Sequence, residues 1–301
     1  MQQDPMIGPG PDLAIVGAAR SGTSLLASQL SLHPDIDPCS VKEPNFFSRG
    51  GGEDVESYDG LFAPREPGLL RLDASASYTY PKFDNALKLL ADTSPDVFVV
   101  YIVRDPVPRA ISHFLFYRHY FRNEKAPTFG EALRASSFYA DVSDYERWCE
   151  VLDNTFPTER VLVVPFSALT QSSHGVASVI CEQLRISPSP NVATKVSAHR
   201  NSVVAFRSPM VRKLTSRLRK SRLYPQVRST LGAHRMRQIR ALATEKPELP
   251  SSEEVLASCD AGQRAQLAAL EDRARRAVDD WLTRQDARTG LNWGAQWRGS
   301  A

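Results

Sequence analysis

The sequence Leu13-Ala-Ile-Val-Gly-Ala-Ala-Arg-Ser-Gly-Thr-Ser24 decides the fold class. Its first four residues are apolar, as in a short buried strand, and small residues follow them. Leucines then recur at helical spacing from Thr23 to Leu32, and His33-Pro34 ends that pattern. A strand, a loop and a helix in this order place free backbone N–H groups and the positive end of the helix dipole at the loop. The segment therefore predicts an anion-binding loop.

The loop itself indicates which anion it suits. Its spacing nearly matches the GxxxxGK[ST] loop of nucleoside triphosphatases, but Thr23 stands at the lysine position and Arg20 is the nearest cation. A triphosphatase uses that lysine on its β- and γ-phosphates, whereas one transferable group on a 5′-phosphate needs only backbone donors and a cation. Gly22 permits close backbone approach, and Thr23 and Ser24 add hydroxyl groups. The alternative is a small-residue turn for close helix–sheet packing.

A second motif follows another apolar run. Residues 97–103 are rich in β-branched and aromatic side chains, as expected of a central strand buried on both faces. The stretch Arg104-Asp-Pro-Val-Pro-Arg-Ala-Ile-Ser112 begins where that strand ends, and ligands of parallel α/β sheets bind at this edge. Arg104 can bind a phosphate bidentately, and Ser112 can donate to the same group. Alone, the turn is also compatible with a structural corner; the two motifs together indicate a nucleotide with phosphates at both ends.

The remaining pattern predicts an α/β fold. Residues 110–121 and 144–154 are typical of helices, residues 160–165 of a strand, and residues 252–282 of a C-terminal helical extension. Strands that alternate with helices favour a central parallel sheet. We expect a P-loop-like three-layer sandwich in a single domain over residues 1–301, with the core in about 12–206 and a basic helical lid or acceptor region in 207–301.

Composition limits the function classes. The chain has 301 residues, 42% of them hydrophobic and 24% charged, which is typical of a globular protein. Its four cysteines show no metal-ligand spacing, so we expect no metal and no disulfide framework. The start of the chain resembles no signal peptide and no apolar run could span a bilayer, so we expect a cytoplasmic protein without a transmembrane segment.

Charge is unevenly distributed. No Asp or Glu occurs between Glu182 and Glu245, although the net charge is only +3. This basic stretch indicates either an anionic partner, which includes an acidic membrane surface, or a solvated helical face.

Together the two motifs resemble the family of sulfotransferases that use PAPS (3′-phosphoadenosine 5′-phosphosulfate). In that family an SGT core binds the 5′-phosphosulfate and an RDPxxRxxS stretch binds the 3′-phosphate. The resemblance covers about residues 12–210. Lys42-Glu-Pro-Asn-Phe-Phe47 and Tyr145–Leu169 resemble segments of heparan sulfate 3-O-sulfotransferases. Bacterial carbohydrate and natural-product sulfotransferases are similar as well.

The resemblance implies a role for each matching residue. Arg20, Ser21, Gly22, Thr23 and Ser24 would hold the 5′-phosphosulfate, while Arg104 and Ser112 would hold the 3′-phosphate. Arg200 falls at a late nucleotide-binding loop of the family. Glu43 would be the catalytic base and Arg20 the catalytic cation, with PAP (adenosine 3′,5′-bisphosphate) as product and no metal. His119 is the alternative base, and His113 is expected to point away from the phosphate.

Three departures from the family pattern concern charge and the adenine. Ala74 and Arg20 stand where the heparan enzymes have lysines, so Arg20 would act alone or with Lys42 or Lys82. Leu25 and Leu26 follow Ser24, so the tryptophan that stacks on adenine in many small-molecule members is absent, and no residue is assigned to the adenine.

The acceptor is expected on the other side of Glu43. Asn45 and Ser48 stand where the heparan enzymes carry polar acceptor-side residues. They favour a hydroxyl, rather than an amine, of a carbohydrate, glycolipid or glycosylated small molecule; anionic or lipid-linked acceptors belong to this class. Two other functions stay open: a kinase-like P-loop phosphotransferase, and a non-catalytic module that binds anionic surfaces, with no nucleic acid partner expected.

Overall fold

The structure is a computed structural model, and it describes residues 10–50, 55–187, 189–193, 205–206, 244–245 and 248–299. Two predictions concern residues outside these ranges. One assigns Arg200 to the nucleotide, and the other makes residues 207–301 a basic lid or acceptor region, of which residues 207–240 lie outside the described ranges.

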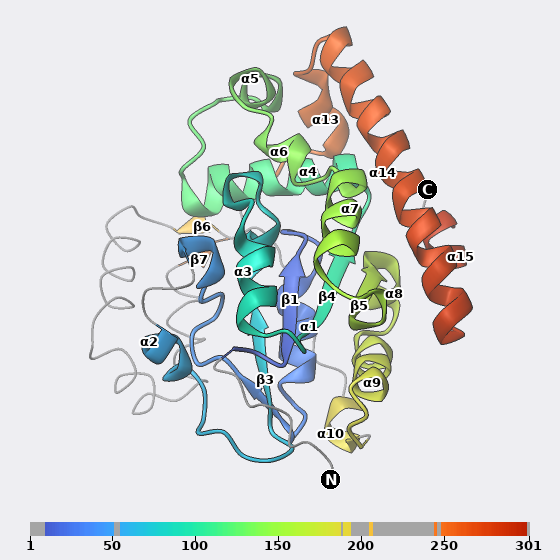
Figure 1. Ribbon diagram of the computed structural model, residues 1–301. Helices are drawn as coiled ribbons and strands as arrows, with labels where there is room; N and C mark the ends of the chain where they lie inside the picture. Colours follow the sequence, from blue (N-terminus) through green and yellow to red (C-terminus); the bar gives the residue numbers. More distant parts are fainter. Residues whose placement is uncertain are drawn as a thin grey trace.

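A five-stranded parallel sheet forms the centre of the molecule, in the order β2-β3-β1-β4-β5 (Figure 1). The strands are β1 (Leu13–Gly17), β2 (Ile36–Pro38), β3 (Leu70–Ala74), β4 (Phe98–Val103) and β5 (Val161–Pro165). Every residue of β1, β4 and β5 is buried, as their continuous apolar sequences predict. Two further strands, β6 (Ala205–Phe206) and β7 (Thr244–Glu245), pair antiparallel to each other. The predicted α/β fold with a central parallel sheet is confirmed.

Helices cover both faces of the sheet, because right-handed crossovers in opposite directions from β1 and β3 place their helices on opposite sides. Helices α3 and α7 lie against one face (Figure 1), and α1 and α9 pack together on the other. The helices before the basic segment are α1 (Thr23–Leu30), α2 (Val55–Asp59), α3 (Ala86–Thr93), α4 (Pro106–Phe116), α5 (Phe129–Ala135), α6 (Phe138–Asp141), α7 (Tyr145–Thr155), α8 (Phe166–Gln171), α9 (Ser173–Gln183) and α10 (Pro190–Ala193). Short 3₁₀ turns are η1 (Phe47–Arg49), η2 (Ala76–Thr79), η3 (Pro81–Phe83) and η5 (Thr158–Arg160).

The C-terminal helical extension is confirmed. It consists of α13 (Ser252–Ala257), α14 (Ala261–Thr289) and α15 (Trp293–Arg298), and α14 packs along α7 at the side of the sheet (Figure 1). Ser251 and Asp260 begin α13 and α14 with capping boxes. No helix among the described residues is long and apolar enough to span a membrane.

Helix α14 also completes the edge strand of the sheet. The side chain of Gln285 is buried, accepts a hydrogen bond from the Val163 N–H at 2.8 Å and donates one to the Val163 carbonyl at 2.9 Å. An unpaired edge strand exposes such groups to other chains. The amide of Gln285 therefore occupies the place that a neighbouring strand would take.

The helix predicted over residues 110–121 differs from the structure. Helix α4 begins earlier, at Pro106, where the missing proline N–H suits a first helical turn. The last five predicted residues form a π-helical turn, η4 (Tyr117–Phe121), which ends at Arg122 with φ 53°. Such turns occur often at functional sites because they alter the direction of side chains.

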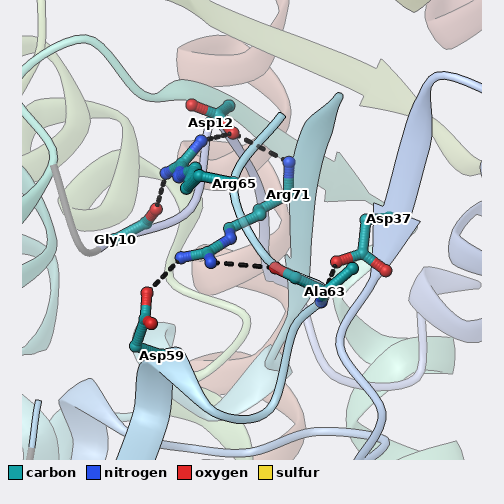
Figure 2. A network of polar contacts seen from close by, with 7 residues as sticks. All are labelled: Gly10, Asp12, Asp37, Asp59, Ala63, Arg65 and Arg71. Atoms are coloured by element: carbon teal, nitrogen blue, oxygen red, sulfur yellow. Dashed lines mark hydrogen bonds and ion pairs between the residues drawn. The ribbon is translucent and has the colours of Figure 1, made fainter. Parts of the chain in front are cut away.

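A polar network lies at the end of the sheet where β1 and β3 begin (Figure 2). Asp12 accepts hydrogen bonds from the Arg65 guanidinium at 2.5 Å and from the Arg71 N–H at 2.8 Å. The buried Arg71 side chain reaches Asp59 and the Ala63 carbonyl. The loop before β3 is thus bound to the start of β1, which sets the position of β3 in the sheet.

Candidate functional site

The loop between β1 and α1 presents backbone donors at the carboxyl edge of the sheet. Among the described residues, no backbone hydrogen bond engages the N–H groups of Gly22, Thr23 and Ser24. Gly22 adopts φ 94°, and a Cβ there would lie 2.7 Å from Leu169 Cδ2, so both conformation and packing require glycine. Ser21 is fully buried under the loop. The loop has the free donors that an anion needs.

Arg20 joins the two predicted motifs. Its Nε donates to Ser112 Oγ at 3.3 Å, and its guanidinium lies 4.2 Å from the centre of the Phe116 ring. Its backbone is left-handed, with φ 71°, which is uncommon outside glycine and turns the side chain toward α4. Ser112 is 92 positions away from Arg20 in sequence, and this hydrogen bond joins it to the phosphate loop.

Arg104 lies at the end of β4, as predicted. Its Nη1 donates to the Arg20 carbonyl at 3.2 Å, and its guanidinium lies 4.9 Å from the centre of the Phe166 ring. The Tyr145 hydroxyl donates to the Arg104 carbonyl at 2.7 Å, and it also accepts from the Arg104 N–H at 3.2 Å. The backbone of this arginine is thus fixed while its side chain contacts the phosphate loop.

Arg109, to which the sequence analysis gave no role, is buried and binds the backbone of the loop between β1 and α1. Its fully buried side chain donates to the Ala19 carbonyl at 3.1 Å, to Ser143 Oγ at 2.6 Å and to the Tyr139 carbonyl at 2.5 Å. In the sequence, the only indication of a role for Arg109 was its place in the same short motif as Arg104, on the other side of two prolines. Only the fold, however, shows that the second arginine binds backbone rather than ligand.

These three arginines form a strongly positive site. Burial, and then the charge of Arg104, lowers the pKa of Arg20 to about 10, and burial also lowers the pKa of Arg104 and of Arg109. Among the described residues, no carboxylate lies within ion-pair distance of Arg104 or Arg109. Buried positive charges without anionic partners are costly. A bound phosphate group would relieve that cost.

Glu43 lies opposite the loop on a constrained segment. Glu43 and Asn45 have φ 54° and 55°. The Asn45 side chain donates to the Glu43 carbonyl at 2.6 Å, and the Asn45 N–H donates to Ser75 Oγ at 3.1 Å. Ser75 in turn donates to Asp73 at 2.7 Å, a fully buried carboxyl on β3. The side chain of Glu43 is 40% exposed and lies 3.8 Å from the Lys42 ammonium.

Asp73 is a further functional candidate that sequence reasoning did not identify. It also accepts hydrogen bonds from Tyr58 at 2.8 Å and Tyr78 at 2.6 Å. Burial raises its pKa, and these hydrogen bonds partly oppose that rise. This carboxyl links the central sheet to the segment that carries Glu43.

A cavity of about 490 Å³ lies between the loop and Glu43. It brings together Arg20, Gly22, Thr23, Ser24 and Glu43. A volume of this size suits a small ligand. Among the described residues that line it there is neither Ser112 nor the alternative base His119. Lys82 is likewise outside this lining and lies 4.7 Å from the Phe83 ring centre, whereas Lys42 is part of it.

His113 is buried in the wall of the cavity, where it contacts Arg109. Arg109 donates to its Nδ1 at 3.1 Å, so the neutral ring keeps its proton on Nε2, 3.3 Å from the Tyr80 hydroxyl. Burial, and then the charges of Arg109 and Arg20, holds the pKa of His113 well below 6.5. A neutral imidazole here donates to Tyr80 and positions that hydroxyl.

Comparisons with known proteins agree with this arrangement. Residues 10–226 match a family model described as "Sulfotransferase domain". A relative in Mus musculus, heparan sulfate glucosamine 3-O-sulfotransferase 6, is 34% identical over 111 residues, which are 36% of this chain and 32% of the relative. A bifunctional heparan sulfate N-deacetylase/N-sulfotransferase of Caenorhabditis elegans is 35% identical over 111 residues, 35% of this chain and 12% of the relative. The matched segment thus spans a third or less of these relatives.

One solved structure has a similar fold. The sulfotransferase from Alicyclobacillus acidocaldarius superposes with a TM-score of 0.52 at 23% identity, over 76% of this chain and 98% of that one. At this identity the similarity concerns the fold alone.

Proposed function

The chain belongs to the sulfotransferase family, since that family's model matches residues 10–226, and we propose that it transfers a sulfuryl group from PAPS to an acceptor hydroxyl. The observation that carries the proposal is the meeting of two anion-binding elements beside a carboxylate. The amides of the loop and Arg20 lie at one side of the cavity, and Glu43 lies at the other.

The donor fits the residues present. The free N–H groups of Gly22, Thr23 and Ser24, with Arg20, would hold the 5′-phosphosulfate. Arg104 and Ser112 would hold the 3′-phosphate, since both contact Arg20 and so lie within one nucleotide's reach of the loop. PAPS supplies the sulfuryl group, whose bond to the 5′-phosphate oxygen breaks as its bond to the acceptor oxygen forms. Arg20 would stabilise the charge that develops on that phosphate oxygen.

The proton of the acceptor hydroxyl would go to Glu43. Glu43 lines the cavity, whereas the alternative base, His119, lies on η4, where burial and then Arg118 and Arg122 lower its pKa. Asn45 donates hydrogen bonds to the Glu43 carbonyl and to Ser75 Oγ, and these bonds would hold the Glu43 segment in a fixed position during transfer. A general base must lie within hydrogen-bond reach of the proton that it removes, and only Glu43 of these two candidates faces the cavity.

For the acceptor we propose a class of compounds and no single molecule. The relatives' names specify heparan sulfate and so support a carbohydrate acceptor; one names an O-sulfotransferase and the other an N-sulfotransferase. We propose a hydroxyl rather than an amine, on a carbohydrate, a glycolipid or a glycosylated small molecule. We place the reaction in the cytoplasm and within a single domain, on the sequence features given above.

A transfer assay tests the proposal. The chain is incubated with PAPS labelled in the sulfuryl group and a panel of hydroxyl compounds, and labelled product is separated by chromatography. We expect product with wild type, and a loss of turnover of about 100-fold or more in Glu43→Gln with PAP affinity unchanged within twofold. Equal turnover in Glu43→Gln would exclude it as the base, and the absence of both product and PAP binding would reject the function.

A further inference from the structure

The cavity beside Glu43 has an aromatic wall, defined here by the rings of six lining residues: Tyr80, Phe83, Phe116, Tyr117, Tyr120 and Phe121. They come from two segments, one after β3 and one at the α4–η4 junction. Phe116 and Tyr120, like Tyr117 and Phe121, are four residues apart, so all four rings lie on one side of the α4–η4 segment, the side that lines the cavity.

The rings of the aromatic wall have the geometry of a stacking surface. Phe116 and Tyr120 stack with centroids 4.9 Å apart and planes 8° from parallel, and Phe121 meets Phe116 edge-on at 4.9 Å. Phe121 remains 40% exposed. Aromatic faces in such an arrangement favour a further ring placed against them. The wall is therefore suited to a flat apolar ligand.

Three polar side chains of the cavity, Asn45, Ser48 and Ser77, are hydrogen-bonded within the protein. Ser77 Oγ donates to Asn45 Oδ1 at 2.5 Å, Ser48 and Ser77 lie 2.6 Å apart, and Asn45 Nδ2 donates to the Glu43 carbonyl. A saccharide needs a partner for each hydroxyl that it buries, and an unpartnered one is costly. Asn45 and Ser48, expected to meet the acceptor, both line the cavity and are also hydrogen-bonded to Ser77. The hydrogen bonds among Asn45, Ser48 and Ser77 leave these three side chains fewer groups to offer a sugar.

Two residues of the aromatic wall, Tyr80 and Tyr117, also carry hydroxyl groups. The Tyr80 hydroxyl accepts a hydrogen bond from His113 Nε2 and is also hydrogen-bonded to Tyr117. Burial raises the pKa of Tyr117, and the carboxylate of Glu43 raises it further. Glu43 and Tyr117 both line the cavity. An acceptor hydroxyl would therefore lie beside Glu43 and Tyr117, and an attached ring would lie along the aromatic wall.

From this geometry we infer that the acceptor is an aryl compound, whose hydroxyl meets Glu43 and Tyr117 and whose ring stacks on the aromatic wall. The inference rests on the proposed sulfuryl transfer, but it replaces the carbohydrate acceptor proposed above with an aryl one. The reaction then forms an aryl sulfate or arylalkyl sulfate and PAP, with the hydroxyl proton on Glu43.

The test compares acceptors and two matched variants. Wild type is assayed with PAPS and either 2-naphthol, 4-nitrophenol or 2-phenylethanol, and in parallel with methyl glucoside and a heparan sulfate tetrasaccharide. Phe121→Ala removes one ring of the wall, and Leu32→Ala is the control because its side chain is similarly exposed, at 38%, and lies outside the cavity lining. Calorimetric titration with PAP monitors the donor site in each protein.

We expect sulfation of the aryl compounds and none of the saccharides. In Phe121→Ala the kcat/KM for 2-naphthol falls by about tenfold, while Leu32→Ala and all PAP affinities stay near wild type. The inference is overturned, with the donor assignment intact, if PAP binds but only saccharides are sulfated, or if no aryl compound is. An equal effect of Phe121→Ala and Leu32→Ala also overturns it. Loss of PAP binding in wild type would instead reject the sulfotransferase function itself.

Discussion

Arg275 Nη2 lies 2.6 Å from Asp105 Oδ1, and so the long C-terminal helix is bonded to the residue that follows Arg104. Asp105 precedes the first residue of α4, where the strand turns into the helix. Arg275 is held in its turn by Trp297, whose indole donates to the Arg275 carbonyl at 3.3 Å. Helix α14 lies outside the segment matched by the family model, residues 10–226, yet it contacts the turn assigned to the 3′-phosphate.

Replacing Arg275 is therefore expected to weaken nucleotide binding from a distance. Arg275→Met removes the partner of Asp105 and frees the Arg104 turn, and we expect about a tenfold weaker Kd for PAP, or about 1.4 kcal/mol. Arg284→Met is the matched control, since Arg284 pairs from the same helix with Asp153 at 2.9 Å, an ion pair on α7. Titration calorimetry measures both. Equal Kd values in the two variants would show that α14 does not position the turn.

His113 is expected to make stability depend on pH. The native ring stays neutral because its pKa lies well below 6.5, while the imidazole of the unfolded chain takes up a proton as the pH falls below that value. The unfolded state then binds more protons, so the free energy of unfolding falls by about 1 kcal/mol from pH 6.5 to about 5.5. Above pH 6.5 this contribution vanishes.

Urea unfolding of wild type and His113→Gln at several pH values checks the effect. The variant is expected to be less stable overall but to lack this part of the slope below pH 6.5. Parallel stability curves for the two proteins across that range would mean that His113 titrates alike in both states.

Gln285 is expected to contribute strongly to stability. Gln285→Leu leaves the buried N–H and carbonyl of Val163 without their side-chain partners. We expect the free energy of unfolding to fall by about 2–4 kcal/mol, because each unpaired backbone group carries its own desolvation cost. Gln266→Leu, at an exposed position of the same helix, is the control in a urea titration. A loss no greater than that of the control would contradict this role.

The fold could be predicted where the sequence signal was local. Strands β1 and β4 are continuous apolar runs, and Gly22 marks the loop between strand and helix. Strand β3 carries Arg71 and Asp73 in its interior, and such residues oppose a strand prediction. Their partners, Asp59 and Tyr58, lie on a helix earlier in the chain, and only the folded protein brings them together.

The site divides in the same way. Arg20, Arg104 and Glu43 could be predicted as candidates because each belongs to a short motif, and the structure brings Arg20 against both Arg104 and Ser112. Arg109 was not assigned because its acceptors are backbone carbonyls far away in sequence. The aromatic wall was missed because Tyr80 and Phe83 lie far in sequence from the aromatic residues of α4 and η4, and only the fold brings the two groups to one cavity.

Calorimetric titration of wild type and Arg104→Ala with PAP, and of wild type with AMP, tests the central claim most directly. We expect wild type to bind PAP much more tightly than AMP, and Arg104→Ala to lose about 30-fold or more in PAP affinity, about 2 kcal/mol at least, because a buried charge partner of the 3′-phosphate is removed. The affinity of wild type for AMP is expected to resemble that of Arg104→Ala for PAP. Equal affinities of wild type for PAP and AMP, or no effect of Arg104→Ala, would contradict the assignment of this site to PAPS.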